Sequence, residues 1–186
     1  PNDGHEVKAL EWLVRFATNE DNGVGYGERD DLRPFHIANI VRSHRDRTGS
    51  DDAAIRFGLE LMEDIMTELR SRARFLQDWD QRVEFDTPWG KGVAIETDFG
   101  SSDTFAYNQG FACRIQKHRP DAIASIKCAP KSGADLTDTY QKALAVEPDS
   151  WYLHQSKLMM ISNIKPETGK RPTQLSLQQL IDFVKI

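Results

Sequence analysis

The chain has 186 residues, of which 28% are charged and 39% hydrophobic, a composition typical of a folded globular protein and not of a disordered or fibrous one. Its 29 acidic residues outnumber its 24 basic ones, giving a net charge of −5, which argues against wrapping of duplex nucleic acid but permits a local basic site. The longest bulky apolar run, Leu158–Ile161, is far shorter than the roughly 18 residues of a membrane span, so no membrane partner is expected. Two cysteines make no disulfide framework and the start of the chain is no secretory signal, so we expect an intracellular, cytoplasmic protein.

The first 85 residues predict a helical section. Apolar residues recur every three or four positions over 7–17, which predicts a helix that ends near Gly23. A short second helix is expected over 34–41, where a proline suits the first turn. The longest uninterrupted helical pattern covers 51–83 and predicts a packing helix of about 45 Å at 1.5 Å per residue.

After residue 85 the helical period gives way to short alternating segments separated by turn residues. The fold class is therefore expected to be α+β, with a helical packing section over 1–85 that includes one long helix, and a mixed-sheet, substrate-binding section over 86–186. Strands are predicted at 93–97, 112–117, 123–128 and 151–154, and helices at 102–109, 136–144 and from Ser176, where Gln179 completes a capping box.

The clearest candidate site lies at the last predicted strand, in the segment from Trp151 to Lys157. Alternation along a strand would place His154 and Ser156 on one face, and Lys157 adds a full positive charge. These three side chains are expected to bind an anion such as a substrate phosphate. A polar strand end without any ligand explains the same residues, so both interpretations stay open.

A second candidate is Asp21, which lies in an acidic cluster at the end of the first predicted helix. Carboxylates suit Mg²⁺ or Mn²⁺, but two adjacent acids without a nearby histidine make an incomplete site, and an ordinary helix terminus explains them too. Cys113 and Cys128 fall in two predicted strands, where a free cysteine usually acts as a small apolar residue.

The order of these features resembles the DHH-like phosphoesterases, specifically the melanocyte-proliferating-gene exonuclease family. In that family an Asp-Asn-Gly segment closes the catalytic half, and the segment starting at Asp21 looks like it. The long helix reaching Trp79, the Pro88-Trp89 turn before a strand, and the late strand carrying His154 are similar to later features of the family. The resemblance covers nearly the whole chain through short motifs.

The chain departs from the family in two places. The Asp-His-His triplet and the earlier His and Asp ligands of the metal cage are absent and would belong upstream of Pro1. The glycine-rich Asn-Lys segment that follows the family's late histidine is replaced by Gln155-Ser156-Lys157. What the resemblance implies is therefore limited to Asp21 as one metal ligand and His154 as a contact to substrate phosphate.

The leading hypothesis is the C-terminal portion of a metal-dependent phosphohydrolase or nuclease of DHH-like type, with Mn²⁺ or Mg²⁺ as cofactor once the missing half is assembled. It would supply substrate phosphate binding through His154, Ser156 and Lys157, and part of the metal site through Asp21. Its partners would be an N-terminal catalytic half or partner chain and a nucleotide or nucleic-acid end. The alternative is a non-catalytic interaction or dimerisation module, in which the long helix mediates either dimerisation, giving a homodimer, or docking to another protein.

Overall fold

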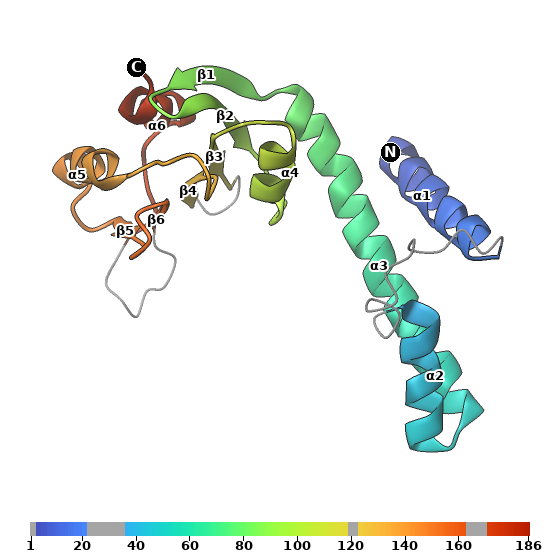
Figure 1. Ribbon diagram of the computed structural model, residues 1–186. Coiled ribbons are helices and arrows are strands. Elements are labelled where there is room, and N and C mark those ends of the chain that lie inside the picture. The colour runs from blue at the N-terminus through green and yellow to red at the C-terminus, as the bar shows by residue number, and fades with distance from the viewer. Residues whose placement is uncertain (1–2, 22–35, 119–122, 163–170) are drawn as a thin grey trace. The chain divides into compact units, whose positions relative to one another are not determined.

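The computed structural model describes residues 3–21, 36–118, 123–162 and 171–186, and Figure 1 traces their order. Within these residues six helices and one six-stranded mixed sheet occur, with an all-helical part first and a section that contains the sheet after it, so the α+β prediction is confirmed. The chain divides into two compact units, Pro1–Arg74 and Phe75–Ile186. No helix among the described residues combines the length and apolar character that a membrane span requires.

The first unit contains α1 (Asp3–Asp21), α2 (Ile37–Thr48) and most of α3 (Asp51–Asp80). Arg70 on α3 donates two hydrogen bonds to the Glu6 carboxylate on α1, at 2.5 and 2.6 Å. The His44 ring on α2 stacks on Phe57 of α3 with the centroids 4.4 Å apart. These contacts join both shorter helices to α3.

Two of the predicted helix ends are wrong. The helix expected over 34–41 runs instead from Ile37 to Thr48, because its arginines continue the helical turn that Gly49 closes with a φ of 65°. The long helix ends at Asp80 and not at Val83, which begins a strand. Val83 satisfies the helical spacing from Trp79, but its β-branched side chain also suits a strand, and pairing with the next strand decides between them.

The second unit is built on a sheet with the strand order β1-β2-β3-β4-β6-β5. Strands β2 and β3 are parallel and are joined through α4, whereas every other neighbouring pair is antiparallel. The elements are β1 (Val83–Thr87), β2 (Gly90–Glu96), α4 (Ser102–Asn108), β3 (Cys113–Lys117), β4 (Ala124–Cys128), α5 (Thr137–Val146), β5 (Trp151–Leu153), β6 (Met159–Ser162) and α6 (Leu177–Val184).

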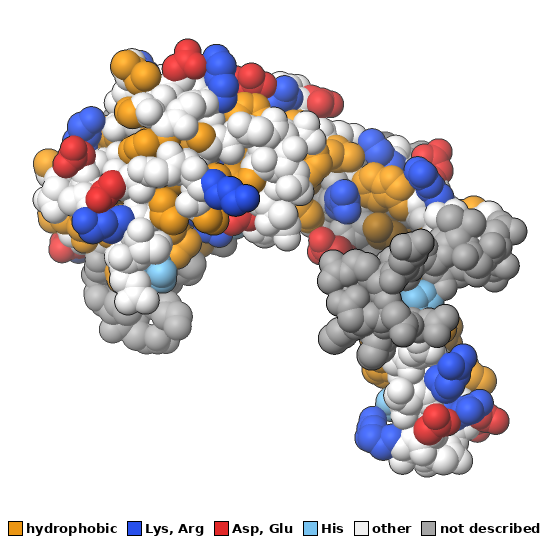
Figure 2. Space-filling view, viewed as in Figure 1, with side chains coloured by type: hydrophobic (Ala, Val, Ile, Leu, Met, Phe, Trp, Pro, Cys, Tyr) orange, Lys and Arg blue, Asp and Glu red, His pale blue; other side chains and the backbone are white. Residues whose placement is uncertain are grey.

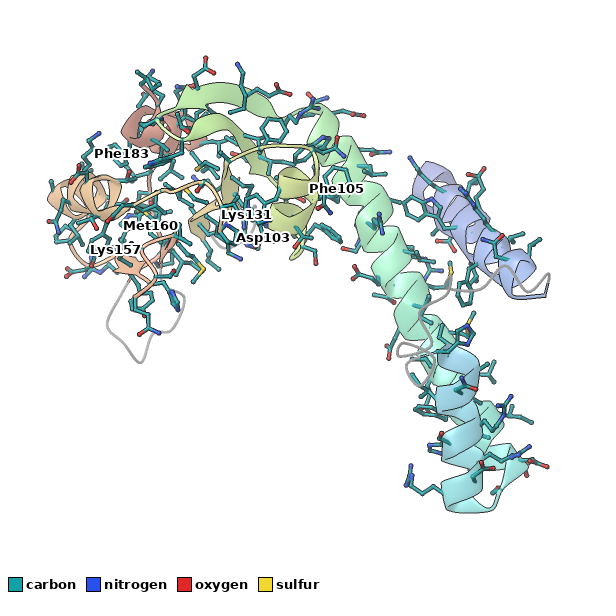
Figure 3. The ribbon with its side chains drawn as sticks, viewed as in Figure 1. Asp103, Phe105, Lys131, Lys157, Met160 and Phe183 are labelled. Carbon is teal, nitrogen blue, oxygen red and sulfur yellow. The ribbon has the colours of Figure 1, made fainter. Side chains whose placement is uncertain are left out.

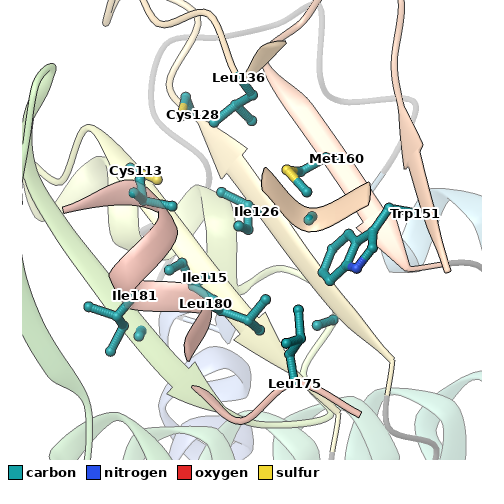
Figure 4. Packing of buried hydrophobic residues seen from close by; sticks show 14 residues of the cluster. Cys113, Ile115, Ile126, Cys128, Leu136, Trp151, Met160, Leu175, Leu180 and Ile181 are labelled. Carbon is teal, nitrogen blue, oxygen red and sulfur yellow. The ribbon is translucent and has the colours of Figure 1, made fainter. Parts of the chain in front are cut away.

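The two faces of this sheet carry different side chains because successive residues of a strand point to opposite faces. One face packs against α5 and α6 and forms the larger apolar core, in which Ile115, Ile126 and Met160 are fully buried (Figure 4). The other face packs Val93 and Ile95 against α4 and the end of α3. Helix α6 begins with the predicted capping box between Ser176 and Gln179, which is confirmed.

Candidate functional site

The turn between β5 and β6 contains the three residues expected to bind substrate. The His154 amide donates to the Met159 carbonyl at 2.9 Å, and the Lys157 amide donates to the His154 carbonyl at 2.8 Å. Lys157 has a φ of 59°. This is a left-handed backbone conformation, which residues other than glycine and asparagine rarely adopt. His154 and Ser156 therefore lie in a tight turn, and not along a strand face as the alternation predicted.

Hydrogen bonds within the turn orient the His154 ring. The Ser156 amide donates to Nδ1 of His154 at 3.2 Å, and the Ser156 hydroxyl lies 2.9 Å from the same nitrogen. The Leu158 amide donates to the Ser156 hydroxyl oxygen at 3.3 Å. The hydroxyl can therefore donate its own hydrogen bond to Nδ1 of His154. A neutral His154 then carries its ring proton on Nε2, where it is available to a ligand.

Lys157 belongs to the same turn, and its side chain forms an exposed ion pair. Its Nζ is 3.1 Å from Oδ2 of Asp135, and both side chains are about half exposed. The Thr137 hydroxyl and amide, followed by Lys157, lower the pKa of Asp135, so this carboxylate stays charged at neutral pH. An exposed pair of this kind is screened by solvent and contributes little to stability.

A second polar cluster lies on the α4 face of the same sheet and joins three elements. Lys127 on β4 donates to Oδ2 of Asp103 on α4 at 2.8 Å. Arg114 on β3 is 1% exposed, and its Nη1 donates to the Ser125 hydroxyl at 2.7 Å. Its Nη2 lies 3.9 Å from Oδ2 of Asp103, and its Nε has no hydrogen-bond partner among the described residues.

The charges of this cluster do not balance. Burial lowers the pKa of Arg114 against the opposing effect of Asp103, but a guanidinium stays protonated in proteins. Burial alone would raise the pKa of Asp103, yet the Lys127 hydrogen bond, the Thr104 amide and the Arg114 charge outweigh it and lower that pKa. Two cations therefore share one carboxylate.

The register of the strands relates the cluster to the turn. Arg114 pairs with Lys127, and Lys127 pairs with Met159, whose carbonyl accepts the His154 amide. These four residues form one transverse row, and with strands about 4.8 Å apart the row spans about 14 Å. Figure 3 labels Asp103 on α4 and Lys157 at the turn, at the two ends of this region. In Figure 2, acidic and basic side chains are interspersed on the visible face of the second unit.

Sequence reasoning did not single out the Arg114 cluster. Arg114 alternates with the apolar Cys113 and Ile115, which indicates only that it points away from their core. Alternation does not say that α4 covers this side, nor that Asp103 approaches it. The one available signal was an arginine between the apolar residues Cys113 and Ile115 of a predicted strand.

The two cysteines are free and buried, and they lie directly opposite one another on β3 and β4. The neighbouring Cys128 thiol and burial raise the pKa of Cys113. Both thiols belong to the larger apolar core (Figure 4), where a protonated cysteine packs as a small apolar residue.

The metal site expected at Asp21 lies outside what the structure describes. Asp21 is the last residue of α1, but its side chain is not among the described ones. Over the described ranges, no group of three or more His, Cys, Asp and Glu side chains could hold a metal ion. The described residues therefore do not by themselves fit a metal cage.

Comparison of the chain with protein-family models, with curated proteins and with solved structures found no match.

Proposed function

We propose that the chain is the C-terminal portion of a metal-dependent phosphohydrolase or nuclease of DHH-like type, acting inside the cell, and that its sheet unit binds substrate phosphate. The observation that supports this proposal is the β5–β6 turn, in which the His154 imidazole contacts the Ser156 hydroxyl and the next residue, Lys157, carries an exposed ammonium group. The left-handed backbone conformation of Lys157 also supports the proposal, because rare backbone conformations concentrate at functional sites. The resemblance carried by Asp21 and His154 agrees with it.

Each group of the turn has a defined role in this proposal. The Nε2 proton of His154 donates to a phosphate oxygen, while Ser156 holds the ring through Nδ1. Lys157 exchanges its exposed Asp135 partner for the phosphate, which is the more highly charged anion. A nucleotide or a nucleic-acid end provides such a phosphate.

The proposal assigns the metal chemistry to another part of the assembly. Asp21 would contribute one ligand, and a catalytic half, from the same polypeptide or a partner chain, would contribute the rest. Mn²⁺ or Mg²⁺ bound there would activate water for attack on the phosphate ester. The described residues bind and orient the substrate.

The test compares AMP with adenosine by isothermal titration calorimetry on the 186-residue chain. AMP should bind, adenosine should bind at least tenfold more weakly, and His154→Ala should weaken AMP binding at least fivefold. Gln155→Ala is the matched control, because this exposed neighbour belongs to the same turn but has no proposed role. Equal AMP binding by His154→Ala and the parent chain would refute the phosphate site.

A second measurement examines the division of labour. The 186-residue chain should not hydrolyse a phosphodiester such as bis-p-nitrophenyl phosphate with Mn²⁺. Metal-dependent turnover by this chain, abolished by a chelator and absent from a denatured sample, would contradict the assignment of the metal cage to another part.

One observation favours the alternative, an interaction module built on the long helix. Ile55 and Leu59 of α3 are 60% and 62% exposed, and apolar side chains of α1 are exposed to a similar extent. Residues four apart share one face of a helix, so this apolar strip suits a second copy of the chain. A concentration-dependent dimer in sedimentation velocity, lost in Leu59→Glu, together with no AMP binding, would support the module over the hydrolase.

A further inference from the structure

We propose that Arg114 and Lys127 form a separate phosphate-binding site, and that the Asp103 carboxylate occupies it internally until a ligand displaces it. The residues differ from those of the β5–β6 turn, so this inference stands without the proposed function. It rests on the unbalanced charge of the cluster and on the Nε of Arg114, which has no hydrogen-bond partner among the described residues.

A buried cation needs a partner for its charge. Removing a charged group from water costs several kcal/mol, and side chains such as Arg are almost never fully buried unless paired. Arg114 is 1% exposed, yet its nearest carboxylate, Asp103, lies 3.9 Å from Nη2 and is hydrogen-bonded to Lys127. One carboxylate thus serves two cations, and the cluster retains a net charge of about +1.

The hydrogen bonds of Arg114 show where an anion would bind. Nη1 uses one proton on Ser125, whereas Nε has no partner within the part of the chain that the structure describes, and Nη2 lies 3.9 Å from Oδ2 of Asp103, beyond hydrogen-bond distance. The Nε and Nη2 protons point in the same direction along one edge of the guanidinium, the fork that binds two oxygens of a phosphate or carboxylate. The unpartnered Nε donor and the Nη2 donor, which makes only the long contact to Asp103, can therefore bind one anion together.

Asp103 and Lys127 connect this edge to solvent. Their side chains are 20% and 30% exposed, whereas Arg114 lies behind them. Asp103 also accepts a hydrogen bond from the Thr104 amide through Oδ1, so rotation of its carboxylate away from Lys127 leaves it a local partner. A phosphate with two negative charges replaces a carboxylate with one, and it completes the charge balance of both cations.

The experiment removes the internal anion. Asp103→Asn keeps the shape of the side chain but leaves Arg114 and Lys127 without a carboxylate. In phosphate-free buffer this variant should melt at a lower temperature than the parent chain, and millimolar inorganic phosphate should restore it. Calorimetry should show phosphate binding at least tenfold tighter than in the parent.

The same titration in further variants identifies the residues that bind. Lys127→Gln should weaken phosphate binding at least tenfold in the Asp103→Asn chain, while Lys131→Gln, an exposed lysine just beyond β4, should not. All titrations are made in the His154→Ala background, so that the β5–β6 turn does not contribute. Equal phosphate affinities with and without Asp103, or with and without Lys127, would overturn the proposal.

A direct readout applies if Asp103→Asn does not fold. In the Asp103-containing chain the Nε–H resonance of Arg114, assigned by its loss in Arg114→Lys, should shift on addition of phosphate at concentrations where chloride has no effect. A resonance that stays in place up to 50-fold excess phosphate would refute binding at this edge.

Discussion

The substitution Phe75→Ala tests whether the last turns of α3 belong to the folding unit of the sheet. Phe75 is 1% exposed and stands first in the second compact unit. Its ring stacks on Phe99 with the centroids 4.6 Å apart, meets Phe105 edge-on at 5.1 Å and lies 5.7 Å from Trp79. Removing the ring therefore opens a cavity beneath three other aromatic rings.

These contacts determine how much free energy of unfolding the Phe75→Ala substitution removes. A buried Phe→Ala change destabilises by about 3–5 kcal/mol, and aromatic pairs contribute about 0.5–1.5 kcal/mol each beyond the area they bury. With three such pairs lost, we expect a value near the top of the range, about 5 kcal/mol. At a urea dependence of about 1–3 kcal/mol per molar, the midpoint of unfolding should fall by about 2 M or more.

The assay is urea unfolding followed by tryptophan fluorescence, to which Trp79, Trp89 and Trp151 of the second unit contribute. Phe57→Ala is the matched control, because Phe57 is a half-buried phenylalanine on the same helix that stacks on His44 in the first unit. It should leave the transition of the second unit unchanged. A loss below about 1.5 kcal/mol in Phe75→Ala, less than half the usual cost of such a change, would refute the reasoning.

Three further predictions concern the sheet unit. Gly92→Ala would place a methyl group 2.6 Å from the Phe85 ring and should cost about 1–3 kcal/mol by overpacking; a melting curve checks it, and Gly100→Ala, with open space around it, should be neutral. Ser176→Ala removes the capping box of α6 and should cost about 1 kcal/mol in chemical denaturation; no change would mean that the cap contributes nothing to stability. The raised pKa of Cys113 keeps its thiol protonated. This thiol should therefore resist Ellman's reagent at pH 8 in the native chain and react in urea. Rapid labelling of the native chain would contradict the burial of Cys113.

The elements that sequence reasoning predicted best are those set by local spacing. The long helix was identified because its apolar residues recur every three or four positions, and the capping box of α6 is a property of Ser176 and Gln179 alone. Strands β1 and β6 were missed. Val83, the first residue of β1, also fits the helical period, and the apolar run in β6 suits a helix and a strand equally.

The candidate sites also combine features that the sequence predicted with features that only the tertiary structure decided. His154, Ser156 and Lys157 were brought together in the prediction because they are neighbours in the chain, and the sequence alone determined that proximity. The tertiary structure decided the rest: the turn that orients the His154 ring, the Asp135 partner of Lys157, and the meeting of Arg114, Asp103 and Lys127. These last three come from a helix and two strands, and only the pairing of β3 with β4 and the packing of α4 on that face place them together. Local periodicity tells which way a side chain points, whereas the charge and the hydrogen-bond partners that it meets depend on segments distant in the sequence.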